Sequence, residues 1–345
     1  MMTIALDVHT GRTQMVVANL RGDIVLEKII QTTQADLRRE VGAIEGIKEV
    51  VFENGTQSAL VHDALEGLAD VVVSCDPTHN ALIARAEDSC DLRDARRLIT
   101  LRRANALKPV YVPPEPYRSL RRLVCYETEL TKLGAEYKVR IKALCRAQGV
   151  SYRGKSVYSR EQRPETLARF SIPSARAHLR SLYTILDTAR KERLQIRREM
   201  NRITKSLPVV KRLQTIPGIG PVIARTLVAW IVDPRRFRKL SALNAYAGLG
   251  LKQNTSNWSP NTRAYASKRG QRAVKRMLFL AARVTLRGAS AFARRYTARR
   301  AAGWDDRTAI RDVARTMLFV ARKLWISGEE YDDARVSVPK APRAN

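Results

Sequence analysis

The sequence predicts an α/β domain at the amino terminus followed by an all-α remainder, and three observations lead to this prediction. Residues 1–75 alternate short β-branched runs with amphipathic segments, which is typical of strands and helices in turn. Residues 179–207 carry an apolar heptad stripe, which indicates a long coiled-coil helix. The two parts of the chain also carry opposite net charges, −7 for residues 1–89 and +37 for residues 90–345.

Composition narrows the class of protein. The 345 residues suffice for two or three domains, and 45% hydrophobic with only 6% aromatic residues favours a helix-rich protein. No apolar run approaches the ~18–20 residues that span a bilayer, so no membrane partner is expected. The scattered cysteines predict reduced thiols in a cytoplasmic protein. Basic residues spread over several segments indicate a polyanion partner, nucleic acid rather than a membrane surface.

The amino-terminal elements follow a definite order. The patterns predict strands at 3–8, 14–20, 24–29, 49–53 and 71–74, and helices at 34–45, at 59–68 and from Asp91 onward. Three strands in series with tight turns form an antiparallel meander, and the later alternation with helices implies parallel pairing. The order β-β-β-α-β-α-β-α is that of a ribonuclease-H-like mixed sheet, in which strands one and four are neighbours.

The middle of the chain is predicted to be a helical, coiled-coil region. Residues 109–116 contain four prolines and form an extended linker at a domain boundary. The heptad helix, from Ser174 to Pro208, pairs with a helix at 120–144 of the same chain, with another subunit, or with both. Residues 149–173 are polar and are interpreted as a loop or as a segment that orders on binding.

The carboxy-terminal part is helical and very basic. Amphipathic helices are predicted at 271–286 and at 307–326, the second capped by Asp305 or Asp306. The predicted domains are therefore 1–108, 109–208 and 209–330, followed by a tail at 331–345.

Four carboxylates form the main chemical hypothesis. Asp91 and Asp94 lie three residues apart on one face of a helix, where like charges repel. Asp7 and Glu53 lie near the ends of strands one and four. Each has an ordinary alternative, a helix cap or first-turn acid for Asp91 and Asp94 and a turn or cap residue for Asp7 and Glu53. In a ribonuclease-H-like fold, however, all four converge, and such a cluster predicts one or two bound Mg²⁺, or Mn²⁺, ions.

Two further motifs point to nucleic acid. The run Ile216-Pro-Gly-Ile-Gly220 is typical of a helix-hairpin-helix, in which Gly218 and Gly220 let the backbone approach a phosphate. The alternative is a tight turn without a ligand.

The second motif is a polar loop between basic positions. It contains Thr255, Ser256 and Ser259, followed by Arg263, Lys268 and Arg269. By spacing alone these are solvated loop serines. The four histidines, at positions 9, 62, 79 and 178, are too dispersed to suggest a Ser-His-Asp arrangement.

As a set, these motifs resemble the DEDD transposases of insertion-sequence family 110, which act as bridge-RNA-guided recombinases, and the related pilin-gene invertases. The resemblance covers roughly residues 3–330. It rests on Asp7, on Glu53, on the run Asp91-Leu-Arg-Asp94-Ala95 and on the hairpin motif, together with Ala247-Gly-Leu249 and Ser267-Lys268-Arg-Gly270. In the family's order these motifs correspond to a RuvC-like domain, a coiled coil and a transposase domain.

The resemblance implies a composite active site. Asp7, Glu53, Asp91 and Asp94 would hold Mg²⁺, and Ser256 would be the nucleophile, with Thr255 and Ser259 as neighbouring rivals. The partners implied are donor and target DNA, a non-coding bridge RNA and further copies of the chain in a dimer or tetramer. The function expected is DNA strand cleavage and exchange. The alternatives are a RuvC-like nuclease that uses water, an invertase without a guide RNA, and a non-catalytic nucleic-acid-binding protein.

Overall fold

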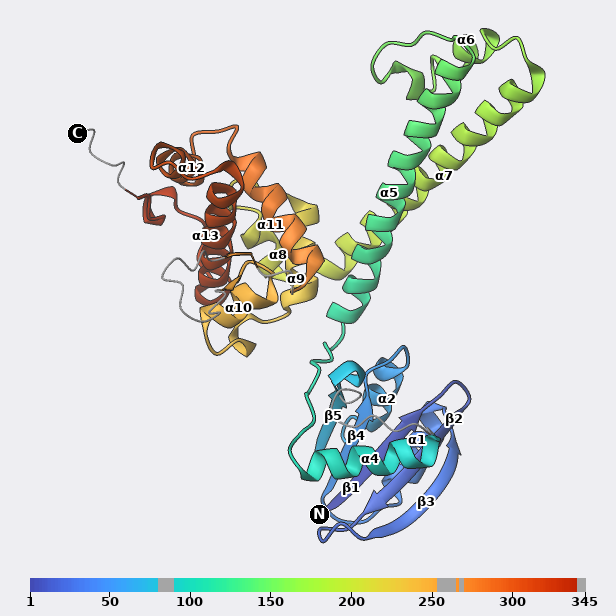
Figure 1. Ribbon diagram of the computed structural model, residues 1–345, viewed down its shortest axis with the longest axis vertical. Coiled ribbons are helices and arrows are strands. Elements are labelled where there is room, and N and C mark those ends of the chain that lie inside the picture. Colours follow the sequence, from blue (N-terminus) through green and yellow to red (C-terminus); the bar gives the residue numbers. More distant parts are fainter. Residues whose placement is uncertain (80–89, 253–264, 267–269, 340–345) are drawn as a thin grey trace, which may run out of the picture. The chain divides into compact units, whose positions relative to one another are not determined.

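The computed structural model describes residues 1–79, 90–252, 265–266 and 270–339. Within these ranges the chain divides into two units, Met1–Pro113 and Pro114–Asn345. The boundary between them along the chain lies within the proline-rich segment 109–116. The first unit is α/β and the second is almost entirely helical (Figure 1). Among the described helices, none is long and apolar enough to cross a membrane.

A five-stranded mixed sheet forms the centre of the first unit. Its strands are β1 (Met2–Val8), β2 (Arg12–Ala18), β3 (Ile24–Gln31), β4 (Lys48–Glu53) and β5 (Val71–Cys75). The spatial order is β3-β2-β1-β4-β5; β1–β2 and β2–β3 are antiparallel, whereas β1–β4 and β4–β5 are parallel. The predicted meander and the predicted contact between strands one and four are confirmed.

Helices cover both faces of this sheet. They are α1 (Gln34–Gly42), α2 (Ser58–Leu65) and α4 (Asp91–Arg103). Ile4 and Phe52 point into one apolar core together with Leu37 and Val61 of α1 and α2. Their chain neighbours Ala5 and Val51 point into a second core with residues of α4, as the alternation of side chains along a strand requires.

The second unit begins with a long helical hairpin. Helices α5 (Tyr117–Ala147) and α7 (Pro173–Thr204) lie side by side, and the short helix α6 (Arg163–Ala168) lies at their far end (Figure 1). The heptad stripe of α7 packs against α5 of the same chain, with Leu179, Leu182 and Leu186 buried. Intrachain pairing, one of the arrangements that the stripe allowed, is therefore present.

Residues 149–173, predicted to be a loop or a segment that orders on binding, form a packed connection between α5 and α7. Val150, Val157 and Phe170 are buried against Ile141 and Leu179 of the two long helices. A 3₁₀ turn (Ser156–Tyr158) and α6 lie within the segment. Its scattered apolar residues pack on the helical hairpin and so hold the segment in place. Because these residues follow no helical or strand period, they are hard to detect in the sequence.

Most of the remaining helices pack around a large apolar core. They are α8 (Pro208–Leu213), α9 (Pro221–Ile231), α10 (Leu240–Tyr246), α11 (Arg272–Thr285), α12 (Ala291–Ala301) and α13 (Asp306–Ser327). A two-stranded pair joins β6 (Leu251–Lys252) to β7 (Tyr265–Ala266). Asp305 is the N-cap of α13, since its side chain accepts from the Thr308 amide.

The segment predicted as a tail is partly packed. Tyr331 stacks on Phe292 of α12, with ring centroids 5.7 Å apart, and Val336 is buried. Asp333 accepts from the Ala291 amide at 2.7 Å and from the Tyr331 hydroxyl at 2.6 Å. Residues 331–338 therefore belong to the core of the second unit, and residues 340–345 lie outside the described part of the chain.

Candidate active site

The carboxyl ends of β1 and β4 lie next to each other in the sheet. Leu6 pairs with Phe52 in the parallel register, and Asp7 and Glu53 are the next residues along the two strands. Because side chains alternate along a strand, Asp7 and Glu53 share the face of Ala5 and Val51, which is the face that α4 covers. The sheet register therefore places both predicted carboxylates on the side where α4 begins.

Helix α4 contributes its first turn to this face. The helix begins at Asp91, with Cys90 as its N-cap, so both Asp91 and Asp94 are first-turn residues rather than caps. Acidic side chains in a first turn are favoured by the helix dipole. Ala95 and Leu98 anchor the helix in the apolar core below, while Asp94 accepts a hydrogen bond from Arg97 at 3.4 Å.

Asp7, His9 and Asp91 form a cluster of potential metal ligands. One ligand atom from each lies within 4.8 Å of the others. The Nε2 atom of His9 is 3.0 Å from the nearer Asp7 oxygen and 3.5 Å from an Asp91 oxygen. The Asp7 side chain is only 18% exposed, whereas those of His9 and Asp91 are 56% and 62% exposed. The cluster therefore joins one partly buried carboxylate to two groups that solvent can reach.

The pKa of Asp7 reports the electrostatics of the site. Burial raises this pKa above its ordinary value, because the buried carboxylate is poorly solvated. The charge and hydrogen bond of His9 lower the pKa, while the negative charges of Asp91 and Asp94 raise it. The environment thus penalises an ionised Asp7, and a cation at this point would relieve the penalty.

The structure brings some of the predicted ligands together and not others. Asp7 and Asp91 are in the cluster, and Asp94 is close enough to affect the pKa of Asp7. Glu53 lies beside Asp7 in the register but is outside the group of atoms within 4.8 Å. His9 was missed by the sequence reasoning. The available signal was its spacing, since a residue two positions after Asp7 in an extended segment points to the same side.

The hairpin motif lies in the second unit and its two glycines differ. Gly218 has a φ of +85°, and a Cβ built there would lie 2.5 Å from the Ala281 carbonyl oxygen of α11. Gly220 is the N-cap of α9, and no atom lies within 4 Å of its Cβ position. Gly218 therefore allows the turn to pack closely against α11, whereas Gly220 leaves the start of α9 open.

A groove of about 710 Å³ opens beside this turn. The sides come from α5, α7 and α11, and its basic lining residues are Lys132, Arg193, Arg197 and Arg276. One cation is partly neutralised, since Arg197 donates to the buried Glu127 at 2.5 Å. A helix N-terminus beside several cations has the electrostatics for a phosphate group.

The remaining predicted site residues fall outside the described part of the chain. They are Ser256, its rivals Thr255 and Ser259, and the basic residues Arg263, Lys268 and Arg269.

Residues 90–345 carry a net charge of +37, and such a strongly basic region is typical of nucleic-acid-binding proteins. Comparison with known proteins agrees. Residues 210–297 match the family model of the IS116/IS110/IS902 transposases. This range holds the hairpin motif and runs from α8 into α12.

One curated relative extends the likeness. The chain is 26% identical over 152 residues to the insertion element IS110 uncharacterized 43.6 kDa protein of Streptomyces coelicolor. The match covers 44% of this chain and 37% of that relative. Both likenesses are partial, since the family model spans residues 210–297 and the chain covers little more than a third of the relative's length.

Proposed function

We propose that this protein is a DNA transposase that cleaves and exchanges DNA strands with the help of Mg²⁺. The observation that carries the proposal is the Asp7–His9–Asp91 cluster at the end of β1, in a chain whose residues 210–297 resemble a transposase domain. We further propose that the first unit is a RuvC-like, ribonuclease-H-like domain and that residues 216–220 form a helix-hairpin-helix.

The donor set fits a hard divalent cation. Carboxylate oxygens are the ligands that Mg²⁺ and Mn²⁺ prefer, and Asp7 and Asp91 supply them here. Asp94, in the first turn of α4, and Glu53, at the end of β4, complete the proposed set. When bound, the metal would polarise the scissile phosphate and stabilise the charge that develops there. The raised pKa of Asp7 supports this proposal, because a bound cation would stabilise the ionised carboxylate.

The proposed nucleophile is Ser256. Its Oγ would attack the scissile phosphorus, forming a phosphoserine ester as the bond to the leaving DNA oxygen breaks. The leaving oxygen takes up a proton, and the ester keeps the bond energy that rejoining requires. Ser256 and the carboxylates belong to different units, so two copies of the chain in a dimer or tetramer could share one site. A non-coding bridge RNA is the proposed guide to donor and target DNA.

The second candidate function is that of a nuclease, in which the same carboxylates support hydrolysis of DNA by water. One observation favours it: within the part of the chain that the structure describes, the cluster of Asp7, His9 and Asp91 comes from the first unit alone.

Two variants of the full chain test these proposals with cognate DNA and RNA. Asp7→Asn should reduce Mg²⁺-dependent cleavage at least ~100-fold while salt-sensitive DNA binding persists. The matched control is Glu45→Gln, which neutralises an exposed acid after α1 and should cleave normally. Full cleavage by Asp7→Asn would overturn the metal-site proposal.

The serine mechanism has its own test. Ser256→Ala should abolish covalent protein–DNA adducts and strand exchange, whereas Thr255→Ala and Ser259→Ala should retain both. Cleavage without adducts in the unmodified protein would favour the water mechanism. If binding occurs and no variant or metal condition gives cleavage, the protein is a non-catalytic nucleic-acid binder.

A further inference from the structure

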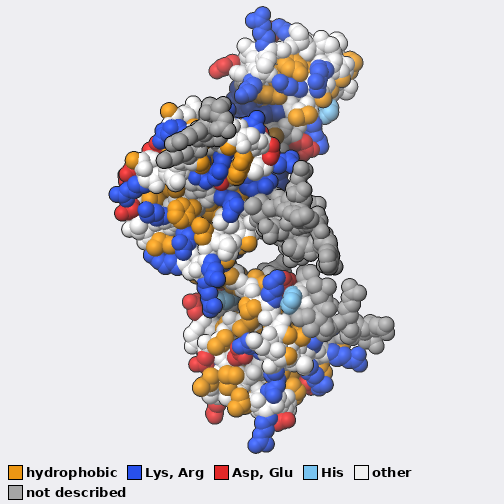
Figure 2. Space-filling view, turned by 60° about the vertical axis from the view of Figure 1, so that its left-hand side comes forward, with side chains coloured by type: hydrophobic (Ala, Val, Ile, Leu, Met, Phe, Trp, Pro, Cys, Tyr) orange, Lys and Arg blue, Asp and Glu red, His pale blue; other side chains and the backbone are white. Residues whose placement is uncertain are grey.

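The far end of the α5–α7 hairpin carries a strongly basic, folded cap. Residues 137–194 contain fourteen lysine and arginine residues against four acidic ones, a net charge of +10. In Figure 2 the Lys and Arg side chains of this end appear in blue at the top of the view. We call residues 137–194 the hairpin tip. Its own apolar core, with Val150, Val157 and Phe170 fully or nearly buried, holds these charges on a fixed framework.

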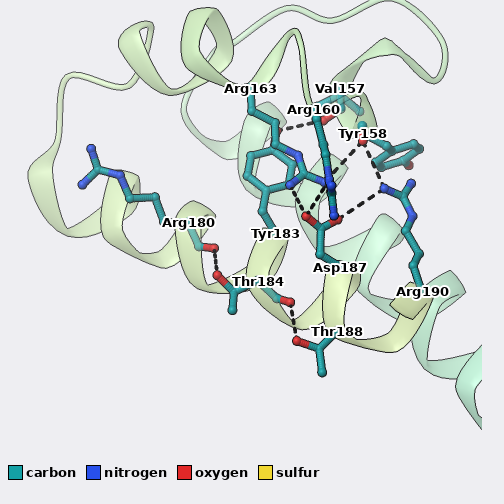
Figure 3. Close-up of polar contacts among 10 residues, drawn as sticks. All are labelled: Val157, Tyr158, Arg160, Arg163, Arg180, Tyr183, Thr184, Asp187, Thr188 and Arg190. Atoms are coloured by element: carbon teal, nitrogen blue, oxygen red, sulfur yellow. Dashed lines mark hydrogen bonds and ion pairs between the residues drawn. The ribbon is translucent and has the colours of Figure 1, made fainter. Parts of the chain in front are cut away.

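Asp187 organises the arginines of the tip. Its carboxylate accepts from Arg163 at 2.7 Å, from Arg160 at 3.3 Å and from Arg190 at 3.5 Å, and Figure 3 shows the three side chains converging on it. Arg163 is nearly buried, lying 4.4 Å over the Tyr183 ring, whereas Arg160 and Arg190 remain 77% and 40% exposed. One carboxylate therefore positions three cations and neutralises only one of them.

Two tyrosines position the lysines on the neighbouring side. The Tyr158 hydroxyl donates to the Lys138 carbonyl at 3.0 Å. The ammonium groups of Lys138 and Lys142 lie 5.8 Å and 5.7 Å from the Tyr158 ring centroid, and that of Lys142 is 5.2 Å from the Tyr152 ring. Aromatic faces favour cations at this range. The lysines of α5 therefore lie on one surface with Tyr152 and Tyr158, which belong to the segment between α5 and α7.

Like charges crowd on this surface. The pKa of Lys138 lies below its ordinary value, first because of burial and then because Arg190, Arg193 and Lys155 are near. These cations come from α5, α7 and the cap, so the fold itself gathers them. Of the four acids, Asp187 binds three arginines and Glu165 pairs with its helix neighbour Arg169. Such crowding costs Coulomb energy that a polyanion would recover.

We propose that the hairpin tip is a further nucleic-acid surface, made of other residues than the carboxylate cluster and the hairpin motif, and that it binds the sugar–phosphate backbone of DNA. Fixed lysines and arginines without a base-reading element favour backbone contacts that are independent of sequence. The choice of DNA rests on the proposed transposase function, whereas the cationic surface does not.

The test measures DNA binding of the full chain by fluorescence anisotropy. The probe is a DNA duplex of arbitrary sequence, with an RNA duplex of equal length as the second arm. The tip variant is Lys142→Gln/Lys155→Gln/Arg190→Gln. The matched control, Arg122→Gln/Lys205→Gln/Lys323→Gln, removes the same charge from exposed positions of the same unit away from the tip.

The tip variant should bind the DNA duplex at least ~10-fold more weakly than the control does. Its slope of log K against log salt should become shallower by ~0.9 for each phosphate that the tip no longer neutralises. Equal losses of affinity in the two variants would overturn the proposal, because they would reflect net charge alone. A loss confined to the RNA arm would overturn the assignment to DNA.

Two controls keep the outcome interpretable. If the triple variant does not fold, the exposed single change Lys155→Gln should still reduce the salt slope by ~1. Cleavage is assayed in parallel, since Asp7→Asn should lose cleavage and keep tip binding. Normal tip binding in a protein without any cleavage would contradict the proposed function alone, and cleavage without tip binding would contradict this inference alone.

Discussion

The imidazole Nε2 of His9 lies 3.0 Å from an oxygen of Asp7 and 3.5 Å from an oxygen of Asp91. This contact links the end of β1 to the start of α4, two elements separated by more than eighty residues of sequence. In the absence of metal, a histidine between two carboxylates moderates their repulsion. It therefore belongs to the electrostatics of the site, whether or not it binds the metal.

Removing His9 should raise the pKa of Asp7 further. The charge and hydrogen bond of His9 both lower that pKa, so His9→Ala leaves burial and the charges of Asp91 and Asp94 unopposed. Carboxyl carbon NMR titration of Asp7 in metal-free protein measures the change. His178→Ala, on α7 in the other unit, should leave the titration unaltered. An unchanged Asp7 titration in His9→Ala would contradict the contact.

The raised pKa of Asp7 also predicts how stability varies with pH. A carboxyl whose pKa is higher in the folded state stabilises the fold below its unfolded value, about 3.9, and loses that contribution as pH rises through the folded value. At pH 7 in EDTA, Asp7→Asn should therefore unfold a few degrees above the unmodified protein. The difference in Tm should vanish at about pH 3.5.

Metal should reverse that difference. Mg²⁺ binds the folded state and should raise the Tm of the unmodified protein with increasing concentration, but not that of Asp7→Asn. Thermal unfolding followed by circular dichroism checks both effects. A Tm that ignores Mg²⁺ in the unmodified protein would speak against a metal site here.

The two hairpin glycines should respond differently to alanine. Gly218→Ala forces a side chain into positive φ and against the Ala281 carbonyl oxygen, so we expect a loss of about 1–3 kcal/mol in the free energy of unfolding. Gly220→Ala has an ordinary φ of −82° and open space, so its effect should stay within about 1 kcal/mol. Urea denaturation compares the two. Equal costs would contradict the packing role of Gly218.

Asp187→Asn should destabilise the hairpin tip. The nearly buried Arg163 would lose a charged partner that it contacts through both terminal nitrogens, at an expected cost of about 1–3 kcal/mol. The Arg163 hydrogen bond holds the pKa of Asp187 below its ordinary value, so this contribution is present above about pH 4 and is lost as pH falls through the lowered value.

Hydrogen exchange of tip amides measures the local effect of Asp187→Asn. The control Glu136→Gln breaks an exposed pair with Arg140 and should cost little. Protection at Val157 and Tyr183 that is unchanged in Asp187→Asn would show that the tip does not depend on this cluster.

Local sequence patterns are enough to predict most of the individual elements of this protein. Alternation along residues 2–8 and 48–53 predicts which side chains face each core. It therefore also predicts that Asp7 and Glu53 lie on the same face of the sheet as Ala5 and Val51. The heptad stripe predicts α7. These features are readable because each depends on periods of a few residues.

The element order predicts that strands one and four are neighbours, whereas the contacts between particular side chains of distant segments follow from tertiary packing. The parallel pairing of β1 with β4 and the docking of α4 put Asp91 beside His9, and no local pattern encodes that register. The packing of residues 149–172 could not be predicted from the sequence pattern either, because Val150, Val157 and Phe170 form a core only together with α5 and α7. Long-range burial, which depends on the partner surface rather than on sequence period, is the physical reason for both.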